Sequence, residues 1–182
     1  MARTVPVIAT EAPGNYLTAA LWMAQTAAIG NWVLGSGSNG PPRFRGYAST
    51  AQSISDATWT ALTIDTEVYD SDGGHSTTTN TSRYTVQVAG TYLITGTAAF
   101  AANATGNRAV RLAVNGTAII GSFDKTLPAT ATHSSSRLSV AQAVCAVGDY
   151  IEVYGYQNSG AALNTSTGTD VAPSLSTQWF AG

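Results

Sequence analysis

The sequence predicts an all-β, antiparallel sandwich or barrel that is preceded by one short helix. Short runs rich in β-branched and aromatic residues recur from Arg43 onward, with turn residues between them. Several runs alternate, and Val110, Leu112 and Val114 share one side of theirs. The pair Asn115-Gly116, typical of a two-residue hairpin, follows directly. We expect strands at residues 44–51, 58–64, 83–88, 91–100, 109–114, 117–123, 137–144, 150–157 and 174–180.

The chain before Arg43 has a different pattern. Residues 1–15 show neither a helical nor a strand period and contain two prolines, which predicts an extended arm. Residues 16–34 are rich in alanine and other helix-favouring residues, and Thr18 can cap the start of the helix. Residues 35–42, with the sequence GSGSNGPP, end the helix and predict a linker.

The predicted helix has an apolar stripe formed by Trp22, Ile29 and the pair Trp32-Val33. A single helix of this length is marginal in water, so the stripe must be covered by something. We therefore expect two parts: an anchor segment, residues 1–42, with Trp22, Ile29 and Trp32 as anchor residues, and a β domain, residues 43–182.

Composition excludes several classes of protein. Only 10% of residues are charged, against about a quarter in ordinary soluble domains, while 44% are hydrophobic. The net charge is −2 and the arginines are scattered, so we expect no nucleic-acid partner. No run approaches the roughly 18 apolar residues of a membrane span, and the N-terminus lacks a signal-peptide layout. We expect no membrane insertion. Cys145 is the single cysteine and cannot form an intrachain disulfide.

Two of the expected strands lack a charged solvent face. In residues 137–144 an aliphatic face of Leu138, Val140 and Val144 lies opposite a small-residue face. In residues 150–157 Ile151 and Val153 share one face, and the tyrosines line the opposite one with Glu152. A sheet face in water alternates with charged residues, so these strands are expected to be covered on both faces. The pattern predicts a subunit interface at Ala141, Ala143, Tyr150, Tyr154 and Tyr156.

Residues for catalysis or metal binding are few. Asp70 and Asp72, followed by Gly73-Gly74, place oxygen ligands one residue apart beside a turn, which suits calcium but equally describes a solvated Asp-Gly loop. His75 and His133 are the only histidines, and both lie in Ser/Thr-rich stretches without a nucleophile motif. The sequence therefore predicts no enzyme activity and no cofactor, with calcium as an open alternative.

Three segments together resemble the complement 1q and tumour necrosis factor-like jelly rolls. They are RYTVQVAGTYLITGTAAF at residues 83–100, RLAVNGTAI at 111–119 and GDYIEVYGY at 148–156. The resemblance covers residues 44–180 and implies an antiparallel jelly-roll sandwich that assembles as a homotrimer around a threefold axis. It also implies that the strand in 148–156 belongs to the sheet facing that axis.

The N-terminal sequence PGNYLTAALWMAQTAAIGNWVL, followed by NGPPRF, resembles the openings of minor tail or head-surface proteins of phages that infect actinobacteria. This resemblance implies a structural protein on the virion surface, joined to other virion proteins through residues 1–42. Two roles stay open: a tail or fibre-tip module that contacts a host-surface glycan or protein, and a head decoration protein that cements capsomers at capsid threefold positions.

Overall fold

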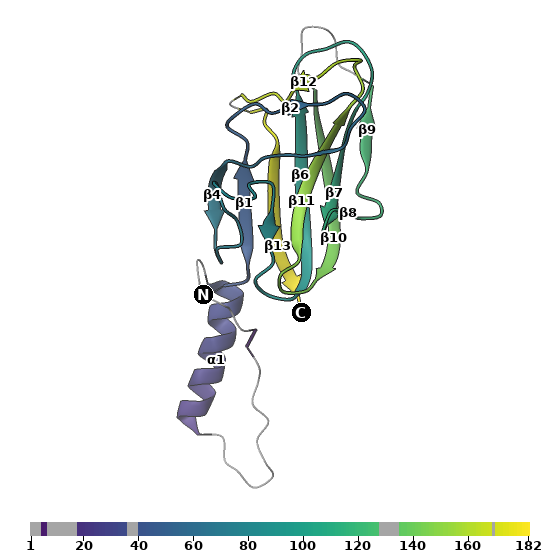
Figure 1. Ribbon diagram of the computed structural model, residues 1–182. Helices are drawn as coiled ribbons and strands as arrows, with labels where there is room; N and C mark the ends of the chain where they lie inside the picture. The colour runs from purple at the N-terminus through teal and green to yellow at the C-terminus, as the bar shows by residue number, and fades with distance from the viewer. Residues whose placement is uncertain (1–4, 7–17, 36–39, 128–134, 169) are drawn as a thin grey trace.

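A computed structural model of the chain describes residues 5–6, 18–35, 40–127, 135–168 and 170–182. Two antiparallel sheets pack face to face as a jelly-roll sandwich, and the helix α1 (Ala19–Leu34) projects from one end of it (Figure 1). The C-terminus lies at that same end. The predicted fold class is therefore confirmed.

One layer of the sandwich is a five-stranded sheet. Its strand order is β10 (Ser135–Cys145), β6 (Gly90–Phe100), β13 (Ser174–Ala181), β1 (Arg43–Tyr47) and β4 (Thr66–Asp70). The longest pairing joins β10 to β6 in unbroken register from Ser135↔Phe100 to Cys145↔Gly90. β10 forms an edge of this sheet, and no further strand pairs with its other side among the described residues.

The second layer is a six-stranded sheet built around β11 (Tyr150–Gln157) and β7 (Arg108–Val114). The remaining members are β3 (Thr60–Ala61), β5 (Tyr84–Thr85), β8 (Thr117–Ala118) and β9 (Asp124–Thr126). A small separate sheet pairs β2 (Ser53–Ile54) with β12 (Leu163–Asn164).

The core lies between the two sheets and is almost wholly apolar. Alternate residues of each strand face it, so Tyr92 and Ile94 of β6 meet Leu112 of β7 and Val153 of β11 there, each with no exposed surface. At Gly96 the sheets approach so closely that a β-carbon would lie 2.7 Å from a methyl group of Leu112. Burial of each large side chain stabilises the fold by about 1.5 to 3 kcal/mol.

One fully buried arginine closes the end of the core at the start of β7. The guanidinium of Arg108 donates to the carbonyl oxygens of Asn103, Thr105 and Asn107 at 2.9 to 3.1 Å. Burial lowers the pKa of Arg108 from its usual value. The three carbonyls therefore hold the preceding turn onto the sandwich while satisfying most donors of a buried cation.

The helix begins as expected. The Thr18 hydroxyl accepts a hydrogen bond from the Leu21 amide at 3.1 Å, which makes Thr18 the N-cap. At the other end the Gly35 amide donates to the Asn31 carbonyl. Within the described part of the chain, no helix is long and apolar enough to cross a membrane.

Each of the expected strand segments contains a strand, in several cases a much shorter one. Four strands were not expected, namely β2, β4, β9 and β12. Residues 66–70 read TEVYD, and their acidic residues obscured the strand pattern of β4. Most of the predicted arm, residues 1–4 and 7–15, lies outside the described residues, as does the centre of the predicted linker, residues 36–39.

A hydrogen-bonded node ties the β7–β8 hairpin to the start of β11. Asn115, at φ +52°, donates its side-chain amide to Asp149 at 2.7 Å and accepts from the Tyr150 amide at 3.0 Å. Asp149 also accepts from the Ala146 amide at 2.7 Å. The hydrogen bond from Asn115, followed by that from Ala146, lowers the pKa of Asp149.

We expect Asp149→Ala to lower the melting temperature at neutral pH. Because the folded-state pKa lies below the unfolded one, Asp149 stabilises the fold above a pH of about 4, and this contribution is lost as the pH falls through the folded pKa. Thermal unfolding followed by circular dichroism at several pH values should show the difference from the unaltered protein vanish in acid. Asp170→Ala, which removes an exposed loop carboxylate, is the control.

Candidate functional site

The outward face of the five-stranded sheet carries side chains that nothing in the described chain covers. On β10 these are Leu138, Val140 and Val144, which are 55%, 50% and 82% exposed, and on β6 Leu93 is 40% exposed. The strand register places Leu138 beside Thr97, Val140 beside Thr95 and Val144 beside Thr91. An aliphatic surface therefore runs along β10 and the adjoining side of β6.

Toward the opposite edge this face changes character. The middle strand β13 contributes Ser174, Ser176 and Gln178, whose cross-strand partners on β1 are Tyr47, Arg45 and Arg43. The guanidinium of Arg43 lies 5.4 Å from the centre of the Tyr69 ring of β4. The face is thus apolar at one end, polar and uncharged in the middle, and basic and aromatic at the other end. We call it the open face, and it comprises the outward side chains of β10, β6, β13 and β1.

The outward face of the six-stranded sheet is covered by its own side chains. Glu152 of β11 is only 2% exposed because Ser82, Arg83 and Tyr154 all donate to its carboxylate, at 2.8, 3.2 and 2.9 Å. Burial, together with the hydrogen bond to Glu152, raises the pKa of Tyr154 to about 12. The guanidinium of Arg83 lies 4.0 Å from the centre of the Tyr150 ring.

An aromatic cluster continues along this second face. The guanidinium of Arg111 lies 4.3 Å from the centre of the Trp59 ring and 5.3 Å from that of Tyr154. Trp59 also contacts Tyr156 and Phe123, at ring-centre distances of 5.2 and 6.1 Å. Cation–π pairs and ring contacts therefore hold these side chains against one another on this face.

The predicted interface residues do not form one surface. Ala141 and Ala143 of β10 pack against the core, so their side chains point away from the open face. The tyrosines Tyr150, Tyr154 and Tyr156 belong to the other sheet and face outward on its far side. For Ala141 and Ala143 the prediction of an outward interface position is therefore wrong, while the three tyrosines form a separate outward-facing group. The aliphatic residues of β10, Leu138, Val140 and Val144, are the exposed ones.

The three predicted anchor residues also differ in their surroundings, since one is buried and two are exposed. Trp32 is only 8% exposed, and its ring meets Trp179 of β13 edge to face at 5.2 Å. Trp22 and Ile29 are 59% and 39% exposed. Trp32 therefore fixes α1 to the sandwich and is not available as an anchor, while Trp22 and Ile29 remain free to contact a partner.

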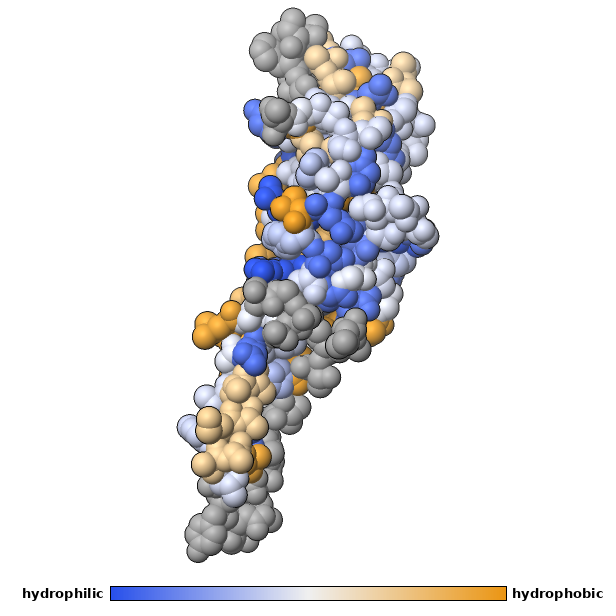
Figure 2. All heavy atoms as spheres, turned by 90° about the vertical axis from the view of Figure 1, so that its left-hand side faces the viewer, coloured by the Kyte–Doolittle hydropathy of each residue, from blue (hydrophilic) through white to orange (hydrophobic). Residues whose placement is uncertain are grey.

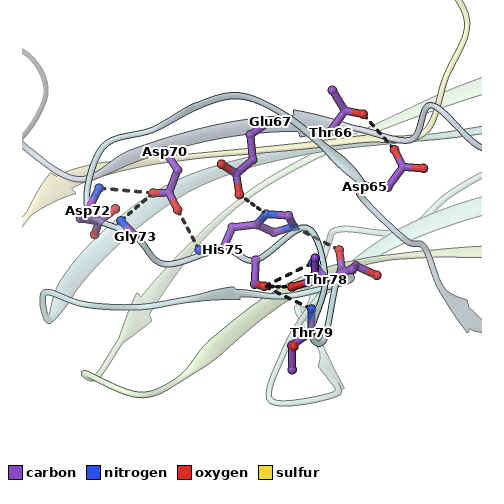
Figure 3. Close-up of polar contacts among 11 residues, drawn as sticks. Asp65, Thr66, Glu67, Asp70, Asp72, Gly73, His75, Thr78 and Thr79 are labelled. Atoms are coloured by element: carbon purple, nitrogen blue, oxygen red, sulfur yellow. Dashed lines mark hydrogen bonds and ion pairs between the residues drawn. The ribbon is translucent and has the colours of Figure 1, made fainter.

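The acidic loop after β4 is organised by its own chain (Figure 3). The Asp70 carboxylate accepts from the backbone amides of Asp72, Gly73 and His75 at 3.3, 3.0 and 2.8 Å. Both oxygens of Asp72 accept from the Tyr84 hydroxyl, at 3.0 and 2.9 Å. Among the described residues, no group of three or more His, Cys, Asp or Glu side chains is arranged to hold a metal ion.

His75 has a structural position beside this loop. Its Nδ1 lies 2.8 Å from Glu67, its Nε2 lies 3.1 Å from the Thr81 carbonyl, and its ring stacks on Phe44 at 4.6 Å. The side chain has no exposed surface. His133 lies outside the described residues. His75 therefore has no access to a substrate, and its contacts hold the loop against β1.

Solved structures with the same fold differ widely in sequence from this chain. The globular domain of zebrafish complement 1qA protein is 12% identical with a TM-score of 0.55, and the match covers 78% of this chain and 99% of that one. Murine APRIL is 17% identical with a TM-score of 0.53, covering 76% and 98%. The phage PRD1 vertex protein P5 is 18% identical with a TM-score of 0.53, covering 77% and 97%.

These likenesses identify the fold as that of the complement 1q and tumour necrosis factor-like jelly rolls. No protein-family model matches the chain, and no curated protein matches it in sequence.

We expect calcium and a chelator to leave the melting temperature unchanged, because the carboxylates of Asp70 and Asp72 already have protein donors. Tyr84→Phe should lower the free energy of unfolding by about 1 to 2 kcal/mol, equally with and without calcium, since it removes a buried hydrogen bond to a carboxylate. Chemical denaturation in both buffers measures this. A lower melting temperature in chelator would restore the calcium interpretation.

Proposed function

We propose that this chain is a non-enzymatic structural protein of a phage particle, in which three copies associate through the open face. The trimer is a tail or fibre-tip module, and residues 1–42 join it to other virion proteins. The observation that carries the proposal is the aliphatic surface of Leu138, Val140, Val144 and Leu93, which a single chain leaves in water. The likeness in fold to a phage vertex protein supports a place on the virion surface.

Two further observations support self-association through this face. Among the described residues, no strand pairs with the outer side of the edge strand β10, and proteins normally cover such an edge. The two ends of the open face also differ in character: the end at β10 is apolar and the end at β1 is basic. Unlike ends favour a head-to-tail contact over a twofold one, and a head-to-tail contact that closes on itself gives a ring such as a trimer.

The six-stranded sheet, which contains β11, has its outward face on the outside of such a trimer, in contrast to the axis-facing position expected for residues 148–156 from the sequence. It presents Trp59, Tyr154 and Tyr156 with Arg111, and Trp, Tyr and Arg are the residues that dominate recognition surfaces. This composition supports contact with a host-surface glycan or protein at that face.

We expect the double variant Leu138→Glu, Val140→Glu to be a folded monomer, because each buried unpaired charge would cost the assembly several kcal/mol. Light scattering after gel filtration should give three times the chain mass of 18.7 kDa for the unaltered protein. Ala118→Glu, at an exposed position of the other sheet, is the matched control and should remain trimeric. An unaltered protein that runs as a stable monomer would refute the proposal.

Removal of residues 1–42 should leave a folded, trimeric jelly roll that fails to join particles lacking the native protein. The reverse fusion, residues 1–42 on an unrelated trimer, should be incorporated. Quantitative mass spectrometry of purified particles measures both, and full occupancy by the truncated protein would contradict the anchor. The copy number from the same measurement tests location: a few copies at the tail fit the proposal, whereas many copies over the head would replace it with capsid decoration.

A further inference from the structure

The helix α1 presents two different sides. One side carries Trp32, which is buried against Trp179. The adjacent side carries Trp22, Thr26, Ile29 and Val33, at steps of four, three and four residues, which brings these side chains into one line along the helix. We call this line the α1 stripe.

The α1 stripe is exposed to solvent over its whole length. Trp22, Ile29 and Val33 are 59%, 39% and 65% exposed. They line a groove together with Gln25, Gly30 and Leu34, and the position above Gly30 is open space. Figure 2 shows little blue on the visible helix, in contrast to the mostly blue and white sandwich above it. The helix has no charged residue between Ala19 and Leu34.

Such a helix needs a partner for physical reasons. Sixteen residues without charged pairs make a marginal helix in water, and its single described aromatic contact with the sandwich is at its C-terminal turn. The stripe advances by eleven residues in three steps, about 3.7 residues each, which is close to the helical period, so it stays on one side of the helix and can pack against a neighbouring helix along its whole length. A membrane surface is a poor partner, because helices that lie on membranes carry Lys and Arg on their polar side.

We infer that the partner is the α1 stripe of two further copies, so that three helices form a parallel, apolar stem below the trimer. This inference rests on the proposed function, since it requires the trimer. The contact between Trp32 and Trp179 fixes the direction in which the helix leaves its sandwich. Three sandwiches related by a threefold axis therefore send their helices from the same end in the same direction (Figure 1).

The stem assigns different roles to residues that the sequence places in one stripe. Trp32 sets the position of the helix on the sandwich, while Trp22, Ile29 and Val33 meet the same residues of the neighbouring copies. The N-terminal end of α1 is the end of the helix remote from the sandwich (Figure 1). The stem thus holds the N-terminal ends of the three helices together at a distance from the jelly rolls.

Cysteine crosslinking of the full chain tests the stem. Val33→Cys is expected to form covalent dimers under mild oxidation at low protein concentration, because the same position of neighbouring helices meets near the axis. Ala24→Cys is the matched control: it is exposed on the side of the helix away from the stripe and should not crosslink. The native Cys145 is buried, so the unaltered protein should give no crosslink.

A second pair of variants separates the stem from the trimer. Adding Ile29→Asp to Val33→Cys should abolish the crosslink while light scattering still reports a trimer held by the open face. Adding Ala24→Asp should leave the crosslink intact. A trimer without the Val33→Cys crosslink, or one in which Ala24→Cys crosslinks equally fast, would overturn the stem and leave the proposed trimer standing. A monomer would overturn the proposed trimer first, and the stem with it.

Discussion

The structure depends on a difference between the two sheets in how their outward faces are covered. The six-stranded sheet covers its own: Glu152 is enclosed by Ser82, Arg83 and Tyr154, and Arg111 lies over Trp59. The five-stranded sheet has no such layer, and its aliphatic residues Leu138 and Val140 face water. A sheet with apolar residues on both faces is stable only when both are buried. The open face is therefore the feature on which the proposed function rests.

The sequence predicted the sandwich but could not assign the faces of β10. Its alternation is plain, with Leu138 and Val140 on one side and Ala141 and Ala143 on the other. Neither side is charged, so the alternation predicts a strand but does not show which of its faces packs against the core. Volume decides the question: the small alanines pack against a core already filled by Tyr92, Val110 and Ile151. The same limit applies to α1, where only the distant Trp179 shows that Trp32 belongs to the domain and not to the exposed stripe.

Two segments that carried the sequence resemblance turn out to be parts of one hydrogen-bonded unit. The Asn-Gly hairpin supplies Asn115, and the Gly-Asp segment supplies Asp149, which accepts from Asn115 and from the Ala146 amide. Neither segment is specific alone, because Asn-Gly and Gly-Asp turns are common. The two segments occur together for a physical reason, since the side chains of Asn115 and Asp149 are hydrogen-bond partners. By contrast, Asp70 and Asp72 matched a calcium pattern because a carboxylate that caps backbone amides uses the same spacing as one that binds a cation. The Tyr84 hydroxyl, which donates to Asp72, distinguishes this hydrogen-bonded loop from a calcium site.

The segments for which we propose self-contact are almost free of charged residues. α1, β6 and β13 contain no charged residue, and β10 contains only Arg137, whose guanidinium lies 3.7 Å from Asp124. The charges of the sandwich lie instead on β1 and β4 at the other edge of the five-stranded sheet, on the six-stranded sheet and in loops. A surface that meets another copy of itself avoids charge, because each charge would meet its like near the axis or lose its water without a partner. A merely inert surface would be low in charge throughout. The uneven distribution therefore favours assembly as the reason for the composition. It marks two surfaces that burial leaves uncovered, the aliphatic end of the open face along β10 and β6 and the α1 stripe.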